Sequence, residues 1–418
     1  MSLKRKFIIL GLFTLAAYAG SISRGESLLW LIAALLSASL ITSLFLPRWL
    51  LQRLSVTRNG PKRGIENETV VFTVEVKNHG WLPRFMVEVV DRLPFISVSK
   101  PDGGANYQLL GNINYLASGK KSSFEVPVLC EKRGLYSLGS VGLASSFPLG
   151  LAQARRMTKQ GQQSFTIYPN VFPILNLPLL GAPSQIHRGG YLLPEGAGAA
   201  EFSGLREYRR GDNPRHIHWP TTARLNDLMV KEFEPLASAC LWIALDLAGD
   251  ANVGKGKHST AEYAIRIAAS IAGYACNHNM HSRLLAETQS GTLRIASGKG
   301  EYHYQCILDA LAVVEANGKT AYAQLLQQIA LDCQRGETIV LLLSEPAMRS
   351  TATLQALALL RTKGAHLFAV LFDRNSFALG GKPSATIEND AFYAGLLELG
   401  AQTRIIRKGD DLMAAFNL

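Results

Sequence analysis

The run LWIALDLA at residues 241–248 is apolar on both sides of Asp246, and two similar runs follow it. These are TIVLLLSE at residues 338–345 and HLFAVLFDRN at residues 366–375. The stretches between them, residues 259–279 and 351–363 among them, carry apolar residues at helical spacing. Strands that are apolar throughout and alternate with helices are typical of a parallel sheet covered on both faces. The sequence therefore predicts an α/β domain with a mostly parallel sheet over residues 237–418.

Three aspartates follow the predicted strands and are the candidate metal ligands: Asp246, Asp250 and Asp373. Ligands of such sheets bind at the carboxyl ends of the strands. A metal-ion-dependent adhesion site needs the pattern D-x-S-x-S after the first strand, but here Ala248 and Asp250 replace the two serines. We therefore expect no cofactor beyond a degenerate metal site, for which Mg²⁺ is the fitting ion because it prefers hard oxygen ligands.

A second chemistry is suggested by GDANVGKG at residues 249–256, which has the G-x-x-x-x-G-K spacing of a phosphate loop. Gly256 stands where such a loop needs Ser or Thr to hold magnesium, and the loop continues to His258 before a helix begins. A flexible surface loop is the preferred interpretation. The alternative is a metal- or nucleotide-dependent hydrolase that uses Asp246, Asp250 and Lys255.

A polar and aromatic stretch precedes this domain, reading EFSGLREYRRGDNPRHIHWPTTARLNDLMVKEFE over residues 201–234. Arginines beside carboxylates permit bidentate pairing, and the rings of Tyr208 and Trp219 offer faces for guanidinium stacking. We predict a motif and linker over residues 179–236, which forms either a partner-docking or anion-binding surface or a clamp between domains. The candidate residues are Arg206, Glu207, Tyr208, Arg210, Asp212, Arg215, Trp219 and Arg224.

The middle of the chain has a hydrophobic period of two. It is seen in TVVFTVEVKN at residues 69–78, FMVEVVDRLP at residues 85–94 and SFEVPVLCE at residues 123–131. Pro127 indicates an edge strand, because proline cannot donate to a sheet ladder. Short alternating strands between turn residues are typical of an antiparallel sandwich. We therefore predict a β-sandwich-like domain over residues 53–178, acting as a scaffold or binding module.

Two apolar segments near the start predict a transmembrane helical hairpin over residues 1–52. They are FIILGLFTLAAYAGSI at residues 7–22 and SLLWLIAALLSASLITSLFL at residues 27–46. A cleaved signal peptide is the competing interpretation of the first segment, but the second follows after only four residues. Only Arg24 lies between the spans, so the positive-inside rule places both ends of the chain in the cytoplasm. The flanking basic residues are Lys4, Arg5, Lys6, Arg48, Arg53, Arg58, Lys62 and Arg63.

The formal net charge of +11 over 418 residues is spread along the chain without a Lys/Arg tract, so we expect no nucleic-acid partner. The lipid bilayer is the expected partner of the basic residues that flank the spans. The cysteines, Cys130, Cys240, Cys276, Cys306 and Cys333, are widely spaced and contain no CxxC pair. We expect them to be small buried apolar residues in a reducing compartment.

These parts in this order resemble the bacterial domain-of-unknown-function-58 family over nearly the whole chain. RGLYSLGSVGL at residues 133–143, SSFPLGLAQ at residues 145–153 and LREYRRGDNPRHIHW at residues 205–219 carry the resemblance. Pro220 departs from it, since a basic or polar residue is expected there, and Asp246 to Asp250 departs from the fuller serine pattern of many members. The matching motif positions are Arg206, Glu207, Tyr208, Gly211, Asp212, Pro214, Arg215, Ile217, Trp219, Ala223 and Arg224.

The resemblance implies a von Willebrand factor A-like fold for the α/β domain and a non-enzymatic adaptor function. It also implies partners, namely a MoxR-type AAA+ ATPase and a transglutaminase-like membrane protein. The expected location is the bacterial inner membrane, with two passes and both termini cytoplasmic. The main hypothesis is thus a membrane-anchored interaction protein, and the hydrolase stays as the alternative.

Overall fold

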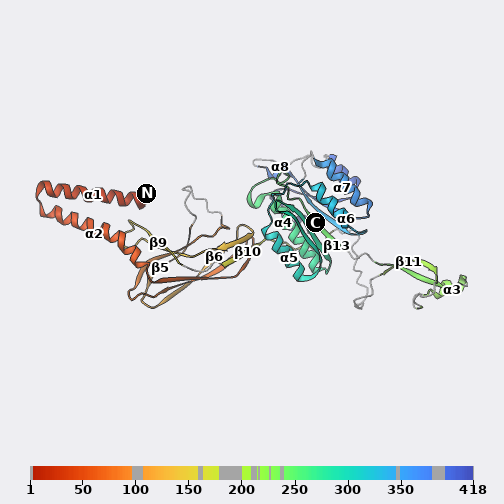
Figure 1. The fold of residues 1–418 in the computed structure, drawn as a ribbon, viewed down its shortest axis with the longest axis horizontal. Helices are drawn as coiled ribbons and strands as arrows, with labels where there is room; N and C mark the ends of the chain where they lie inside the picture. Colours follow the sequence, from red (N-terminus) through yellow and green to blue (C-terminus); the bar gives the residue numbers. More distant parts are fainter. Residues whose placement is uncertain are drawn as a thin grey trace. The chain divides into compact units, whose positions relative to one another are not determined.

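We describe a computed structural model of the chain, which forms two compact units, residues 1–170 and 171–418 (Figure 1). The residues that the structure describes are 3–96, 107–158, 163–177, 200–208, 214, 217–225, 227–235, 240–344, 349–378 and 391–417.

The first unit begins with two antiparallel helices, α1 (Leu3–Arg24) and α2 (Ser27–Leu50). Gly25 connects them with a φ of 67°, a left-handed conformation that glycine adopts without strain. Both helices are long and apolar enough to cross a membrane. They extend beyond the predicted segments, because α2 continues through Pro47 to the first residues of the sandwich.

The rest of the first unit is built from short strands in three sheets of order β1-β3-β6, β2-β10-β7 and β5-β4-β8-β9. One hydrophobic core joins all three, with Phe72, Val89 and Phe165 among its fully buried side chains. The strands are β1 (Leu54–Asn59), β2 (Arg63–Ile65), β3 (Thr69–Asn78), β4 (Arg84–Asp91), β5 (Gln108–Leu116), β6 (Lys121–Leu129), β7 (Gly134–Leu138), β8 (Gly142–Ser145), β9 (Ala154–Met157) and β10 (Gln163–Tyr168).

The alternating pattern correctly predicted three of these strands, β3, β4 and β6. The predicted antiparallel pairing was wrong for β2 and β10, which pair in parallel. In β3, Phe72, Val74 and Val76 are buried and the residues between them face outward or are half-buried. Pro127 lies in β6, which pairs only with β3 among the described strands, so the prediction of an edge strand is confirmed. Cys130 is buried in the same core and Cys240 is buried in β13 (Cys240–Leu245), as expected of small apolar residues. The prediction is wrong for the three cysteines that are only half-buried, Cys276, Cys306 and Cys333.

The predicted end of the sandwich at residue 178 differs from the structure, in which the boundary between the units follows residue 170. The backbone N–H of Phe172 donates to Ser270 Oγ (3.0 Å), and that of Leu175 donates to Asn417 Oδ1 (2.8 Å). The Phe172 ring also packs on Phe416, with ring centroids 5.6 Å apart. This segment therefore belongs to the α/β domain, because its apolar ring and backbone amides find their partners there.

The α/β domain contains a six-stranded sheet, in the described part of the chain, of order β15-β14-β13-β16-β17-β18. All neighbouring strands are parallel except β14 and β15, which form an antiparallel hairpin. The predicted mostly parallel sheet is thus confirmed. The strands are β13 (Cys240–Leu245), β14 (His281–Thr288), β15 (Gly291–Gly298), β16 (Thr338–Leu343), β17 (His366–Phe372) and β18 (Gln402–Ile406).

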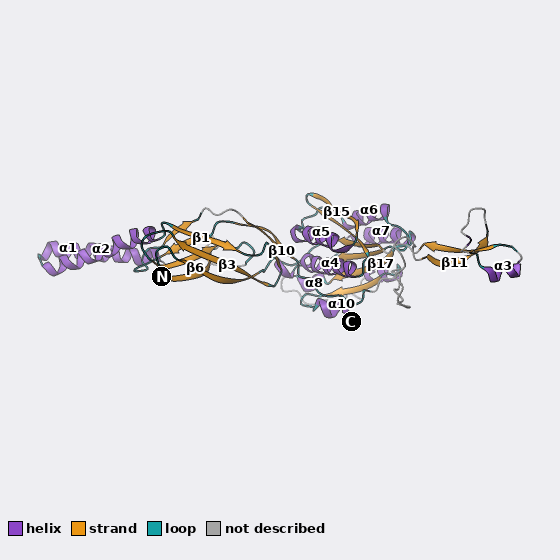
Figure 2. Ribbon diagram, turned by 90° about the horizontal axis from the view of Figure 1, so that it is seen from below, coloured by secondary structure: helices purple, strands orange, loops and turns teal. Residues whose placement is uncertain are grey.

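Helices cover both faces of this sheet (Figure 2). On one face α6, α7 and α9 pack over side chains such as Trp242 and Leu341, and α4 and α5 pack on the other. The helices are α4 (Thr260–Asn277), α5 (Gly300–Val313), α6 (Tyr322–Asp332), α7 (Ser350–Thr362), α8 (Arg374–Phe377), α9 (Ala391–Glu398) and α10 (Leu412–Asn417), with a 3₁₀ turn, η2 (Gly256–His258), before α4.

The segment predicted as motif and linker contains regular structure. Strands β11 (Ala200–Glu207) and β12 (Met229–Pro235) form an antiparallel pair, with a bulge between Phe202 and Gly204. The short helix α3 (Trp219–Leu225) lies between them in sequence. The linker prediction therefore missed a hairpin, because its strands are rich in charged residues and lack the apolar alternation that marked the sandwich.

Candidate functional site

The strand order reverses between β13 and β16, and open α/β sheets bind ligands at such a switch point, outside the carboxyl ends of the strands. The candidate aspartates lie at this edge. Asp246 directly follows β13 and Asp373 directly follows β17, while Ser344 follows β16 between them. The backbone N–H of Asp246 donates to Leu342 O (3.0 Å), which fixes its position beside β16.

Asp246 is a buried carboxyl group, with only 3 % of its surface exposed. Its Oδ1 accepts a hydrogen bond from the backbone N–H of Ala248 (3.1 Å). Its Oδ2 and the nearby Ser344 Oγ are buried and have no hydrogen-bond partner among the described residues. Burial raises the pKa of Asp246 to about 6, and the charge of Asp250 contributes to the rise. Because desolvation disfavours the charged form, this carboxyl group holds its proton into weakly acidic solution.

Two arginines, Arg349 and Arg374, form hydrogen bonds with the residues at this edge of the sheet. The guanidinium group of Arg349 binds both carboxylate oxygens of Asp250, with Nη1 3.1 Å from Oδ1. Arg374 donates to three backbone carbonyls, those of Ala251, Ser344 (2.6 Å) and Asp250 (3.3 Å). Arg374 thereby ties the loop after β13 to the end of β16.

Asp373 is 1 % exposed and caps a helix. Its Oδ1 accepts from the backbone N–H groups of Asn375 (3.1 Å) and Ser376 (3.4 Å) at the start of α8. Its Oδ2 lies 3.8 Å from Nε of Arg407. The structure thus brings the three aspartates to one sheet edge. Two of them already pair with arginines, Asp250 with Arg349 and Asp373 with Arg407. Within the described residues no group of three or more His, Cys, Asp and Glu side chains is arranged to hold a metal ion.

The loop with phosphate-loop spacing is held by side-chain hydrogen bonds. Asn252 Nδ2 donates to Asp246 O (3.0 Å) and Ala248 O (2.9 Å), and the hydroxyl of Thr260 donates to Asn252 Oδ1 (2.9 Å). The helix begins only at Thr260, as predicted, and the hydroxyl of Ser259 accepts from the N–H of Glu262 at its N-cap. Lys255 is exposed and lies directly before the turn η2, so a separate turn stands between it and the start of α4.

Sequence reasoning missed the residues that organise this edge. Arg349 and Thr260 carry no motif, and only their contacts reveal them, while Asn252 lies inside the run with phosphate-loop spacing but was not singled out. Arg374 had one signal, because it directly follows Asp373 at the end of a predicted strand.

The motif residues fall partly outside the described chain. Arg210, Asp212 and Arg215 are not among the described residues. Arg206 and Glu207 lie in β11, opposite Val230 and Met229 of β12. The N–H of Tyr208 donates to Leu228 O (2.8 Å), which continues the pairing by one residue.

Helix α3 has no buried residue. Trp219 at its start is 63 % exposed, and Leu225 at its end is 57 % exposed. Leu228, which precedes β12, is 45 % exposed, and Arg224 is exposed as well. The motif therefore presents large apolar side chains and an arginine on its surface.

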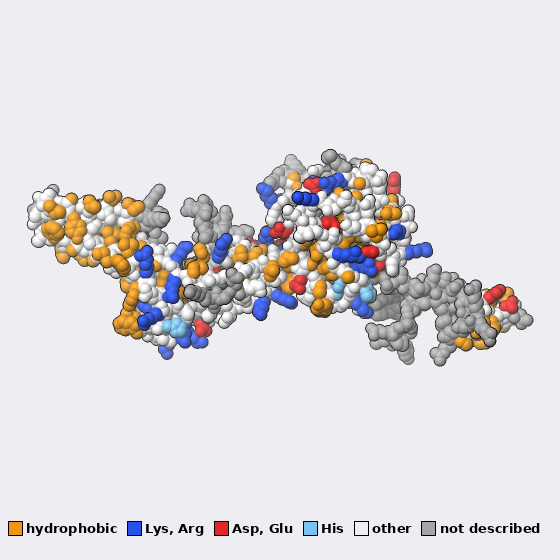
Figure 3. All heavy atoms as spheres, viewed as in Figure 1, with side chains coloured by type: hydrophobic (Ala, Val, Ile, Leu, Met, Phe, Trp, Pro, Cys, Tyr) orange, Lys and Arg blue, Asp and Glu red, His pale blue; other side chains and the backbone are white. Residues whose placement is uncertain are grey.

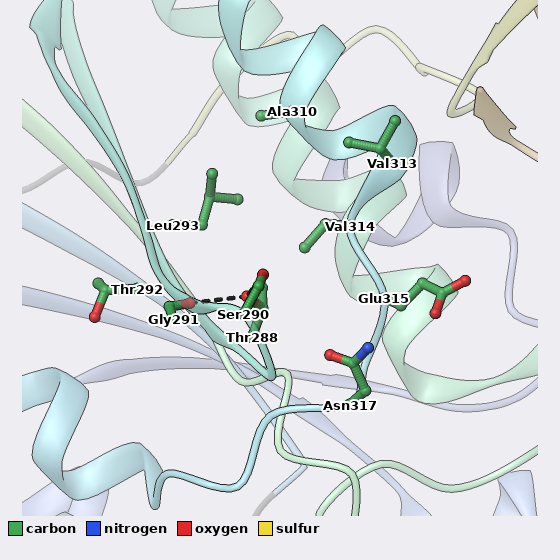
Figure 4. A pocket seen from close by; sticks show the side chains of 10 residues that line it. All are labelled: Thr288, Ser290, Gly291, Thr292, Leu293, Ala310, Val313, Val314, Glu315 and Asn317. Atoms are coloured by element: carbon green, nitrogen blue, oxygen red, sulfur yellow. Dashed lines mark hydrogen bonds between the residues drawn. The ribbon is translucent and has the colours of Figure 1, made fainter.

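A cavity of about 350 Å³ lies beside the turn between β14 and β15 (Figure 4). The end of α5 forms its other wall. Thr288 Oγ1 donates to Gly291 O (2.8 Å), which closes the turn at its rim. The lining residues are Thr288, Ser290, Gly291, Thr292, Leu293, Ala310, Val313, Val314, Glu315 and Asn317. It contains one carboxylate and no cation, so its side chains do not form an acid–base pair.

Comparison with known families gives one match, which covers residues 204–382 and is described as a protein of unknown function, DUF58. Over these residues the chain belongs to the DUF58 family. The match begins within β11 and includes the hairpin motif as well as Asp246, Asp250 and Asp373. The resemblance seen in the sequence is therefore confirmed over residues 204–382, and the family description itself states no function.

No curated protein sequence matches this DUF58 chain. Among solved structures, the CARDB domain of a Pyrococcus furiosus protein with di-metal ions is similar at 15 % identity, covering 27 % of this chain and 86 % of that one, with a TM-score of 0.18. A Listeria innocua beta-glucosidase has 15 % identity, coverages of 25 % and 16 %, and a TM-score of 0.17. A Pseudomonas fluorescens alkylpurine DNA glycosylase has 10 % identity, coverages of 28 % and 30 %, and a TM-score of 0.18. Scores this low carry no argument about function.

Proposed function

We propose that this DUF58 protein is a membrane-anchored, non-enzymatic interaction protein. Helices α1 and α2 hold it in the bilayer, and the hairpin motif beside the α/β domain docks a partner. The partners that the family resemblance implies are a MoxR-type AAA+ ATPase and a transglutaminase-like membrane protein. The observation that carries the proposal is the exposed Trp219 surface of the motif.

The helical hairpin supports membrane anchoring because its polarity is the reverse of that of a soluble helix pair. Small or polar residues such as Ser21, Ala33 and Ser43 are buried between the helices, while Leu12 and Phe13 are 65 % exposed. The Tyr18 and Ser37 hydroxyls bond across the pair at 3.0 Å. Small residues and hydroxyl bonds at the interface, with apolar residues outside, are typical of helices packed in lipid. Figure 3 shows hydrophobic side chains over the visible face of these helices.

The basic residues around the spans support a cytoplasmic location for both termini and an inner-membrane location for the chain. One residue of that set must be left out. Arg58 pairs with Asp91, and its side chain is 4 % exposed, so it holds the sandwich together instead of facing lipid. Lys4, Arg5 and Lys6 before the first span and Arg48 and Arg53 after the second still outnumber Arg24 between them.

The surface of α3 supports docking over an internal clamp. The exposed Trp219, Arg224 and Leu225 side chains belong to residue types found at binding hot spots, in which Trp and Arg dominate. A clamp would instead bury the Trp219 ring, since burying a large aromatic side chain is its main contribution to stability.

A von Willebrand factor A-like assignment of the α/β domain is part of the proposal. The sheet supports it through its strand order, which reads 3-2-1-4-5-6 when strands are numbered along the domain, with the third strand antiparallel at one edge. A non-enzymatic function fits the same edge, because Arg349 and Arg374 already engage Asp250 and the loop carbonyls around it.

The hydrolase alternative rests on the unpartnered Oδ2 of Asp246. Thermal unfolding of the full chain with and without Mg²⁺ and ATP discriminates the two. A ligand at about 100 times its Kd stabilises a fold by roughly 2.7 kcal/mol. A shift of that size accompanied by ATP hydrolysis would favour the hydrolase.

Co-purification from detergent-solubilised membranes tests the docking surface. The MoxR-type ATPase should be retained by the wild type, and Trp219→Ala should weaken retention by about 30-fold, as expected of a hot-spot tryptophan worth about 2 kcal/mol. Tyr302→Ala is the matched control, because Tyr302 is 86 % exposed on α5, outside the motif. If neither the ATPase nor another membrane protein is retained, or both variants behave alike, the docking function is wrong.

A further inference from the structure

The junction between α2 and the sandwich contains an arginine with unused hydrogen-bond donors. Arg84, at the start of β4, is 3 % exposed, and its Nη2 donates to Gln52 O (3.2 Å). Its Nε and Nη1 are buried and have no hydrogen-bond partner among the described residues. A buried guanidinium group without an anion is costly, so the fold retains this group against its own stability.

Further arginines surround Arg84. The charge of Arg53 adds to burial in lowering the pKa of Arg84. Arg156 Nη1 donates to Leu51 O (2.9 Å), and Arg48 lies exposed in the last turn of α2. In the described ranges, none of these four arginines forms an ion pair with a carboxylate.

Capping accounts for only part of this cluster. Cations beside the C-terminal carbonyls of a helix stabilise it. Arg84 and Arg156 each donate one hydrogen bond to such a carbonyl at the end of α2. Among the described residues, Nε and Nη1 of Arg84 have no hydrogen-bond partner and Arg53 has no carboxylate partner, so capping does not account for them. The arrangement is a positively charged site with unused hydrogen-bond donors.

Exposed tryptophans place this site at the level of lipid headgroups. The Trp49 ring is 39 % exposed and its centroid lies 5.1 Å from Arg84 Cζ. Trp81 is 73 % exposed in the turn before β4, and the same turn is bonded to the junction by the N–H of His79, which donates to Arg53 O (2.8 Å). Tryptophan is enriched where a membrane span meets water. The apolar run of α2 ends at the same place.

We infer that this junction binds the phosphate group of an anionic phospholipid. Arg53 and Arg48 attract the headgroup from the rim, and Arg84 offers the planar fork of donors that matches phosphate. The Trp49 ring covers one face of that fork and must turn aside to admit the ligand. A lipid is favoured over free phosphate because apolar α2 and two exposed tryptophans adjoin the site. The inference rests on the proposed membrane anchoring.

Native mass spectrometry of the full chain in detergent micelles tests it, with phosphatidylglycerol and phosphatidylcholine as the two probes. The wild type should retain phosphatidylglycerol preferentially. Arg53→Gln removes an exposed charge that the fold does not use, and should weaken that retention by about fivefold. Arg84→Lys keeps the charge but loses the fork, so it should weaken retention without abolishing it. Arg92→Gln, at an exposed site directly after β4 and at the opposite end of that strand from Arg84, is the control and should leave retention unchanged.

Equal retention of both lipids, or equal retention by wild type and Arg53→Gln, would overturn the inference. Inorganic phosphate in millimolar excess should not displace the lipid, and displacement would show that free phosphate is the ligand instead. Alkaline carbonate extraction separates this failure from failure of the anchor. A chain released by carbonate refutes the membrane function itself, whereas a retained chain without lipid preference refutes only the site.

Discussion

Replacing Asp246 by Asn should remove a pH dependence of stability from the α/β domain. Burial raises the pKa of this carboxyl group from its ordinary 3.8 to about 6. The folded state therefore binds the proton more tightly than the unfolded state. The stabilisation is fully present below about pH 4 and is lost as the pH rises through about 6.

The magnitude follows from the same two values. The pKa of Asp246 rises from 3.8 in the unfolded chain to about 6 in the folded one. At 1.36 kcal/mol per pKa unit, the free energy of unfolding changes by about 3 kcal/mol over the whole titration. About 2 kcal/mol of this falls between pH ~4.5 and pH ~7. Asn has the same shape and cannot titrate, so the difference in stability between Asp246→Asn and the wild type should change by about 2 kcal/mol between these two conditions.

Hydrogen exchange of the β13 amides, measured on the full chain and corrected for intrinsic rates, reports the opening free energy of this domain alone. Asp332→Asn is the control, because Asp332 is 41 % exposed and its surface pair with Arg294 is worth about 0–1 kcal/mol. A wild-type and variant difference that stays constant within about 0.5 kcal/mol at the two pH values would refute the reasoning. Loss of the pH dependence on adding Mg²⁺ would instead show that a cation holds the carboxylate ionised.

Three further substitutions test the packing. Asp91→Asn leaves the buried Arg58 without its partner and should destabilise the sandwich by about 3–5 kcal/mol in urea unfolding, whereas loss of less than about 1 kcal/mol would mean that the pair is solvated. Ser259→Ala removes the N-cap of α4 and should cost about 1 kcal/mol, seen as faster exchange in the first turn of α4 and nowhere in the sandwich. Gly318→Ala pushes a methyl group against a backbone carbonyl of β14 and should cost about 1–3 kcal/mol by thermal unfolding. Gly139→Ala, where a methyl group meets open space, is its control, and equal losses for both would contradict the packing argument.

Local pattern alone was sufficient for the parts of this protein whose burial is periodic in sequence. The continuous apolar runs of β13, β16 and β17 predicted a buried parallel sheet, and the alternation in β3 predicted a half-buried strand. The two apolar N-terminal helices were also predicted, because their length and composition suffice to identify them. In each case one face or one segment decides the structure, so no distant contact is needed.

Only the tertiary structure decided what the polar residues do. The hairpin β11–β12 lacks the apolar alternation of the sandwich strands, and β15 alternates only over Leu293 and Ile295, so the stability of both depends on pairing with a neighbour. Asp246, Asp250 and Asp373 were found from their places after strands, but the arginines that engage two of them come from about 30 to 120 residues away along the chain. Arg84 has no sequence signal at all. Its unused donors arise because folding brings it beside the end of α2, and no local sequence pattern reveals which distant groups will meet.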